Sequence, residues 1–82
     1  MKTNIDRIVD IVVAAQKGFR EYGLRATIYE IERIRTVATS EELAAVGRYV
    51  DLLIADLKAH KGQNVEQDIE NFIEKVRSQT NM

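Results

Sequence analysis

Residues 41–61 carry the longest uninterrupted helical pattern in the chain, and this pattern has apolar positions on two sides. At about 100° per residue, one side is a stripe of large apolar residues. Its members are Leu43, Val46, Val50, Leu53, Ile54 and Leu57. Roughly opposite lie Ala45, Leu52, Ala55 and Ala59, with Tyr49 on the flank. An ordinary surface helix has one apolar stripe, so this pattern predicts a helix buried between the chain's own core and a second layer or a second copy.

A second interpretation of the alanines stays open. Alanine is a good helix former on a wet surface, and Leu52 is the only large residue on the second side. The ends of this helix are better marked. Thr39 and Glu42 have the spacing of a capping box, and Gly62 is placed to end the helix in a left-handed turn.

Three further helices are predicted, at residues 4–22, 28–38 and 65–77. The first has an inward stripe with alternating spacings of three and four: Ile5, Ile8, Val12, Ala15, Phe19 and Tyr22. Gly23 ends this helix, and Thr27 with Glu30 forms a capping box that opens the second. The last helix has a single apolar stripe of Val65, Ile69, Phe72, Ile73 and Val76, and residues 78–82 are expected to be frayed.

These elements predict an all-α fold, a small four-helix bundle in one domain (residues 1–82) with helix 41–61 at its centre. A chain of 82 residues buries only about 60–65% of its unfolded surface. Two of the helices have more apolar surface than one chain can cover. This surplus is the reason to expect a homodimer.

Composition excludes several function classes. The chain has no cysteine, so disulfides and thiolate metal sites are ruled out. No segment is apolar enough to span a membrane, and acidic residues precede the apolar run at 11–15, which argues against a signal peptide. We therefore expect a cytoplasmic protein with no membrane partner. The net charge of −1 does not favour non-specific binding to nucleic acid.

No set of residues predicts catalysis, a cofactor or a metal. His60 is the only histidine, with Asp56 one helical turn before it. Two ligands do not make a zinc site, and His60 is better explained as a cation at a helix C-terminus. The carboxylates all fit helix surfaces or caps. The sequence therefore predicts a protein without enzymatic activity.

Two groups of residues are predicted to contact a protein. Tyr29, Arg33 and Val37 line up on the outer side of helix 28–38, and this mixture of aromatic, arginine and aliphatic residues is typical of interface hot spots. A surface tyrosine packed on an arginine stem explains the same pattern. The second group is Tyr49, Leu52, Ala55 and Ala59 of the central helix. We expect an adaptor, regulator or inhibitor that acts as a homodimer and binds a further, unidentified protein.

The helix at 65–77 also carries an acidic row, Glu66, Glu70 and Glu74. Two interpretations fit the row. It meets the basic side chains Lys17, Arg20 and Arg25, within the chain or across a dimer, or it is a solvated face.

One resemblance supports a different function. Phe19, Gly23, Ala26 and Thr27, preceded by Ile8 and Ala15, resemble the first helix and turn of tetracycline-repressor-type DNA-binding domains over about 25 residues. The resemblance implies a DNA-binding regulator, in which Arg25, Arg33 and Arg35 would contact phosphates. The family's turn glycine is replaced by Arg35, Thr36 and Val37, and acidic Glu41 and Glu42 open the third helix, where they would repel phosphates. DNA binding is the alternative to the protein-interaction hypothesis.

Overall fold

The computed structural model describes residues 4–80, which are mostly helical and contain no strand. The helices are α1 (Asn4–Glu32), α2 (Ile34–Val37), α3 (Ser40–Ala59) and α4 (Val65–Thr80). The all-α class is confirmed. The predicted count of four helices differs slightly from the structure, because three helices have 16 or more residues and α2 is a single turn of four.

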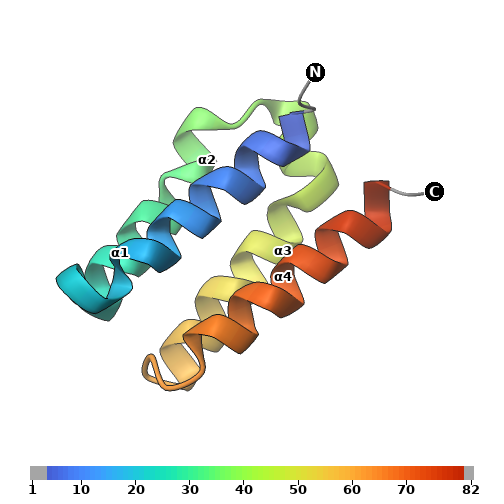
Figure 1. The fold of residues 1–82 in the computed structure, drawn as a ribbon. Coiled ribbons are helices and arrows are strands. Elements are labelled where there is room, and N and C mark those ends of the chain that lie inside the picture. The colour runs from blue at the N-terminus through green and yellow to red at the C-terminus, as the bar shows by residue number, and fades with distance from the viewer. Residues whose placement is uncertain (1–3, 81–82) are drawn as a thin grey trace.

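Helix α1 folds back on itself at Gly23 (Figure 1). The backbone of this glycine has φ 87° and ψ 177°, which is outside the helical region and open mainly to glycine. Although α1 continues to Glu32, its helical geometry is interrupted at Gly23, so the predicted end of the first helix at Tyr22 is confirmed. Gly23 divides α1 into a first half, residues 4–22, and a second half, residues 24–32.

The predicted helix at 28–38 differs from the structure. Its residues belong to the second half of α1, which begins directly after Gly23, and to α2. Thr27 is therefore no N-cap, and the predicted capping box with Glu30 is wrong. The Thr27 side chain is buried, and its hydroxyl donates a 3.0 Å hydrogen bond to the Gly23 carbonyl one turn earlier. Gly23 alone, with its positive φ, turns the chain, so the second half of α1 begins without a separate N-cap residue.

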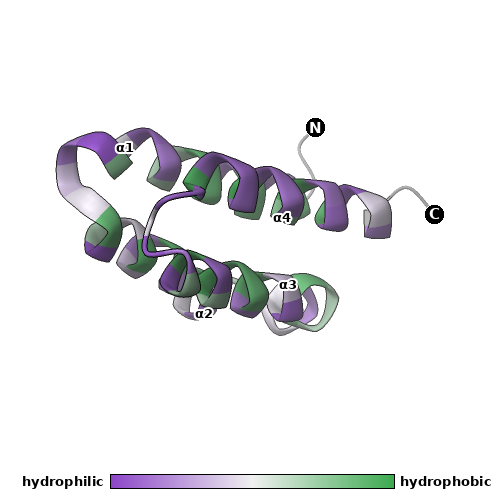
Figure 2. Ribbon diagram, turned by 90° about the horizontal axis from the view of Figure 1, so that it is seen from below, coloured by the Kyte–Doolittle hydropathy of each residue, from purple (hydrophilic) through white to green (hydrophobic). Residues whose placement is uncertain are grey.

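The helical segments form two layers (Figure 2). The first half of α1 and α4 make one layer, and the second half of α1, α2 and α3 make the other. Hydrophobic residues lie mostly between the layers. Helix α3 contacts both α1 and α4, but α1 contacts α2, α3 and α4, so α3 is not the single central helix that the sequence predicts.

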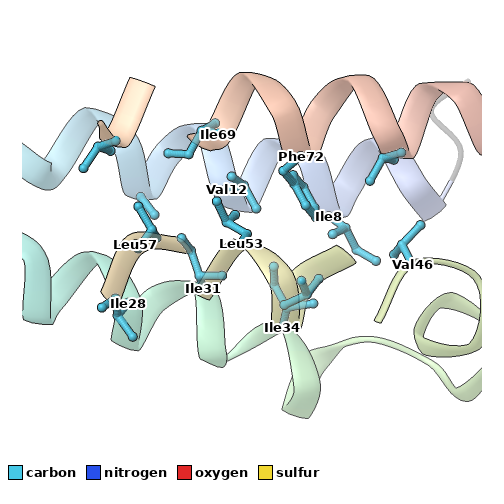
Figure 3. Packing of buried hydrophobic residues seen from close by; sticks show 14 residues of the cluster. Ile8, Val12, Ile28, Ile31, Ile34, Val46, Leu53, Leu57, Ile69 and Phe72 are labelled. Carbon is cyan, nitrogen blue, oxygen red and sulfur yellow. The ribbon is translucent and has the colours of Figure 1, made fainter. Parts of the chain in front are cut away.

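One cluster of buried residues draws on all four helices (Figure 3). Its members are Ile8, Val12, Ala15, Ile28, Ile31, Ile34, Val46, Val50, Leu53, Leu57, Val65, Ile69, Phe72 and Val76. The predicted inward stripes of α3 and α4 are confirmed, with Leu43, Ile54 and Ile73 half-buried at their edges. Loss of a large side chain from such a core costs about 2–5 kcal/mol.

Both ends of α3 have recognisable caps. The Glu42 N–H donates to the Thr39 hydroxyl (3.1 Å) and the Thr39 N–H donates to the Glu42 carboxylate (2.6 Å), so the predicted capping box is confirmed. The helix ends at Ala59, two residues before the predicted end. There the Gly62 N–H donates to the Leu57 carbonyl (3.3 Å) and the Lys61 N–H to the Lys58 carbonyl (3.3 Å). This is a Schellman motif.

The left-handed turn begins one residue earlier than predicted. Lys61 already has a φ of 53°, and Gly62 follows with a φ of 79°. At the other end of α4, the helix continues through Thr80, so the expected fraying is wrong for residues 78–80. Residues 81 and 82 lie outside the described part of the chain.

Candidate interaction surfaces

The outer side of α3 is exposed along its length, so the predicted second layer is absent within residues 4–80. A second copy, or alanines on a wet surface, are the interpretations that remain. We define the α3 face by six exposed residues: Glu41, Ala45, Arg48, Leu52, Ala55 and Ala59. Leu52 is 44% exposed, although leucine is among the most often buried residue types. Three of the predicted contact residues, Leu52, Ala55 and Ala59, therefore point away from the chain's own core.

Tyr49, the fourth predicted residue of this group, is placed differently. Its side chain is only half-exposed and packs against the hydrophobic core. The guanidinium of Arg48 lies over its ring, 5.9 Å from the ring centroid, which is within cation–π range. Tyr49 thus forms the edge of the α3 face and not its centre.

The second predicted group lies on the outer side of α1 and α2. Tyr29 is 65% exposed and Val37 43% exposed, and Arg33 is exposed beside them. The Arg33 guanidinium donates a 3.3 Å hydrogen bond to Glu30, one turn earlier on the same surface. The Tyr29 hydroxyl makes no hydrogen bond within the described residues, and its ring is largely exposed to solvent.

The structure adds Tyr22 to this group. The sequence placed Tyr22 in the inward stripe of the first helix, and this prediction is wrong, because its side chain is 69% exposed. The core ends one turn earlier, where the α3–α4 connection covers Phe19. A Cβ on Gly62 would lie only 3.2 Å from the Phe19 ring. Tyr22 therefore projects beyond the end of the core.

A groove of about 300 Å³ runs between the two halves of α1. It is lined by Ala14, Ala15, Gly18, Tyr22, Ala26, Thr27 and Glu30. The small residues let the two halves approach closely, and Glu30 links the groove to Arg33. We call Tyr22, Tyr29, Arg33, Val37 and this groove the α1 face. Helical spacing could not predict that Tyr22 is exposed, because Tyr22 continues the apolar stripe of the first helix and that stripe is correct up to Phe19.

The two predicted groups do not form one surface. The Arg35 Nε donates a 3.1 Å hydrogen bond to Asp51, so α2 lies along the Asp51 side of α3. Leu52 is turned about 100° further around the helix and faces away from α2. The α1 face and the α3 face are therefore separate.

A partly buried ion pair joins the start of α3 to α1. The Glu42 side chain is 2% exposed, and its Oε1 accepts a 2.7 Å hydrogen bond from Arg7. The backbone N–H of Thr39, followed by the Arg7 guanidinium, holds the pKa of Glu42 below its ordinary value of 4.5. Arg7 also donates to the Val37 carbonyl (3.3 Å). This cluster fixes α2 between α1 and α3 and serves the fold.

His60 pairs with a residue that the sequence did not indicate. Its Nδ1 lies 2.9 Å and 3.1 Å from the two carboxylate oxygens of Asp68, which is 3% exposed and lies in the first turns of α4. The hydrogen bond to Asp68 raises the pKa of His60 above its ordinary value of 6.5, and the charge of Asp56 adds to this effect. Within residues 4–80, no three histidine or carboxylate side chains are grouped to hold a metal ion.

The acidic row of α4 lies partly opposite basic side chains. A groove of about 750 Å³ between the first half of α1 and the start of α4 is lined by Lys17 and Arg20 on one side and by Glu66 and Glu70 on the other. Glu74 and Arg25 are not among its lining residues. Glu66 and Glu70 thus share a groove with Lys17 and Arg20, but no ion pair joins the two groups within residues 4–80 and all three glutamates are exposed, so both interpretations of the row stay open.

Of the three arginines considered for phosphate contacts, two are engaged within the chain. Arg33 pairs with Glu30, and Arg35 pairs with Asp51. Arg25 is exposed. The described helices include none that is long and apolar enough to cross a bilayer.

Comparisons with known proteins add no relative: no family model, no curated protein and no solved structure matches this chain.

Proposed function

We propose that this chain is a small helical interaction protein without enzymatic activity. It binds a protein partner through the α1 face and a second copy of itself through the α3 face. The observation that carries the proposal is the exposure of Tyr22 (69%) and Tyr29 (65%) beside an apolar groove. In this role the protein acts as an adaptor, regulator or inhibitor. A cytoplasmic location is part of the proposal and rests on the sequence.

The composition of the α1 face supports a protein partner. Tyrosine and arginine are enriched among the residues that dominate binding energies, and a tyrosine ring offers a large contact area with few torsions to freeze. The groove between the halves of α1 is of a size to accept one apolar side chain. The paired charges of Glu30 and Arg33 form a polar rim next to it.

The perturbed carboxylate and imidazole support a non-enzymatic role. Shifted pKa values often mark active sites, but each of the two shifts here has a structural cause. Glu42 is the N3 residue of a capping box, and His60 joins the ends of two helices. DNA binding stays the alternative: Arg33 and Arg35 lie in exposed ion pairs with Glu30 and Asp51, which contacts with phosphates would have to replace.

Affinity capture with matched variants tests the partner-binding part. Immobilised wild type is compared with the double variant Tyr22→Ala/Tyr29→Ala in extract from the source cell. Glu66→Ala/Glu70→Ala on α4 serves as the surface control. We expect a protein that is retained by the wild type and the control and is depleted at least tenfold on the tyrosine variant. Equal retention on all three would contradict a binding role for the α1 face.

A further inference from the structure

The spacing of the α3 face is the same in both directions. Its six exposed residues, from Glu41 to Ala59, are separated by 4, 3, 4, 3 and 4 positions. Alternation of three and four is the pattern of a helix that packs along another helix. Since the series is a palindrome, a second copy of the same face matches it when the two helices run in opposite directions.

We propose that two copies pair through the α3 face with their α3 helices antiparallel, in the register where opposite residues have numbers that add up to 100. This inference rests on the self-association included in the proposed function. The register brings Ala45 opposite Ala55 of the second copy, Arg48 opposite Leu52, and Glu41 opposite Ala59. The small pairs allow close approach of the backbones. The aliphatic stem of Arg48 covers Leu52, as long basic side chains cover apolar surface elsewhere.

The charges on α3 favour this orientation. In the proposed register Glu41 lies one position from Lys58 of the second copy, and Arg48 lies one position from Asp51, since each of these pairs adds up to 99. Arg48, Glu41 and Lys58 form no ion pair within residues 4–80, so the Glu41–Lys58 contact would join two unpaired charges. Asp51 already pairs with Arg35 of its own chain, and Arg48 of the second copy would join that pair. The opposed macrodipoles of the two helices also attract.

A parallel arrangement is opposed by the same residues. It would bring Glu41 next to Glu41 of the second copy and Arg48 next to Arg48, and like charges at such positions repel.

The rest of the fold leaves the α3 face open. Val46, Val50, Leu53 and Leu57 face the core on the opposite side of α3, and the His60–Asp68 and Arg35–Asp51 pairs place α4 and α2 on its flanks.

Cysteine cross-linking tests the register, because the natural chain has no thiol. The variants are Ala45→Cys, Ala55→Cys and the double variant with both substitutions. Residues 45 and 55 of one helix are about 15 Å apart, too far for a disulfide within one chain. We expect the double variant, and a mixture of the two single variants, to form covalent dimers at least tenfold faster than either single variant alone. Glu70→Cys on α4 reports the rate of random collision.

Other outcomes separate the register from self-association itself. Rapid cross-linking of Ala45→Cys alone would show either a parallel pair or an antiparallel pair centred on residue 45, and either result would overturn the register. A dimer mass by analytical ultracentrifugation, with no cross-linking above the Glu70→Cys rate, would also overturn it while leaving self-association intact. A monomer mass for the wild type at 100 µM overturns both. Leu52→Glu should weaken the dimer at least tenfold, with unchanged helix content by circular dichroism. The partner-capture experiment does not depend on any of these results.

Discussion

At the scale of single residues, Gly23 has the greatest effect on the fold. Its φ of 87° and ψ of 177° allow α1 to reverse and pack one half beside the other. Nothing lies within 4 Å of a Cβ placed on this glycine, so a substitution there is opposed by the backbone alone. The position therefore isolates the conformational cost of the turn from any steric clash.

We predict that Gly23→Ala lowers the free energy of unfolding by about 1–3 kcal/mol, the usual cost of a sparsely populated backbone conformation. Gly47→Ala is the matched control. Gly47 lies inside α3, and its new Cβ would meet only ordinary contacts with Leu43 at 3.7 Å. Because alanine favours the helix by about 1 kcal/mol, this control should be neutral or stabilising. Urea denaturation measures both changes. Equal effects of the two substitutions would contradict a special role for Gly23.

At the scale of elements, sequence patterns predicted the interior of the bundle better than its connections. The stripes of α3 and α4 are fixed by apolar periodicity, which burial enforces, and the Thr39–Glu42 box is a local signal. The second half of α1 was placed too late, because Thr27 has the residue type of a cap and in fact sits inside a helix. The Asp68 partner of His60 is contributed by another helix, and no local spacing contains that information. Tyr22 was misplaced because periodicity does not show where a core ends.

The His60–Asp68 pair joins the end of α3 to the start of α4 and predicts a dependence of stability on pH. The pKa of His60 is raised in the folded state. The pair therefore stabilises the fold fully below the unfolded pKa of about 6.5, and this contribution is lost as the pH rises through the higher folded pKa. The urea midpoint of the wild type should fall between pH 6 and pH 9.

The matched variants for this prediction are His60→Asn and Asp68→Asn. Neither retains the pair, so the fall in midpoint between pH 6 and pH 9 should be smaller in both than in the wild type. Unfolding followed by circular dichroism at a series of pH values gives the comparison. A variant with the full wild-type pH dependence would show that the titration arises elsewhere in the chain.

At the scale of the whole molecule, α3 divides its surface between the chain's own core and the solvent. Leu52 and Leu53 are consecutive in sequence, yet Leu52 is 44% exposed and Leu53 is 2% exposed. We predict that Leu53→Ala lowers the free energy of unfolding by about 2–5 kcal/mol. At low micromolar concentration, Leu52→Ala should change it by less than about 0.5 kcal/mol, as surface substitutions usually do.

Under the proposed pairing of two copies, the two leucines should also respond differently when the protein concentration is raised. A second copy that binds only the folded chain stabilises it by mass action, so the urea midpoint of the wild type should increase from 1 µM to 100 µM. Leu53→Ala lowers the midpoint at every concentration and keeps this increase, because the α3 face is unchanged. Leu52→Ala should lose the increase, because in the proposed dimer its side chain is needed only between copies. An increase that survives Leu52→Ala would mean that self-association uses a different surface, and the exposed side of α3 would then need another explanation.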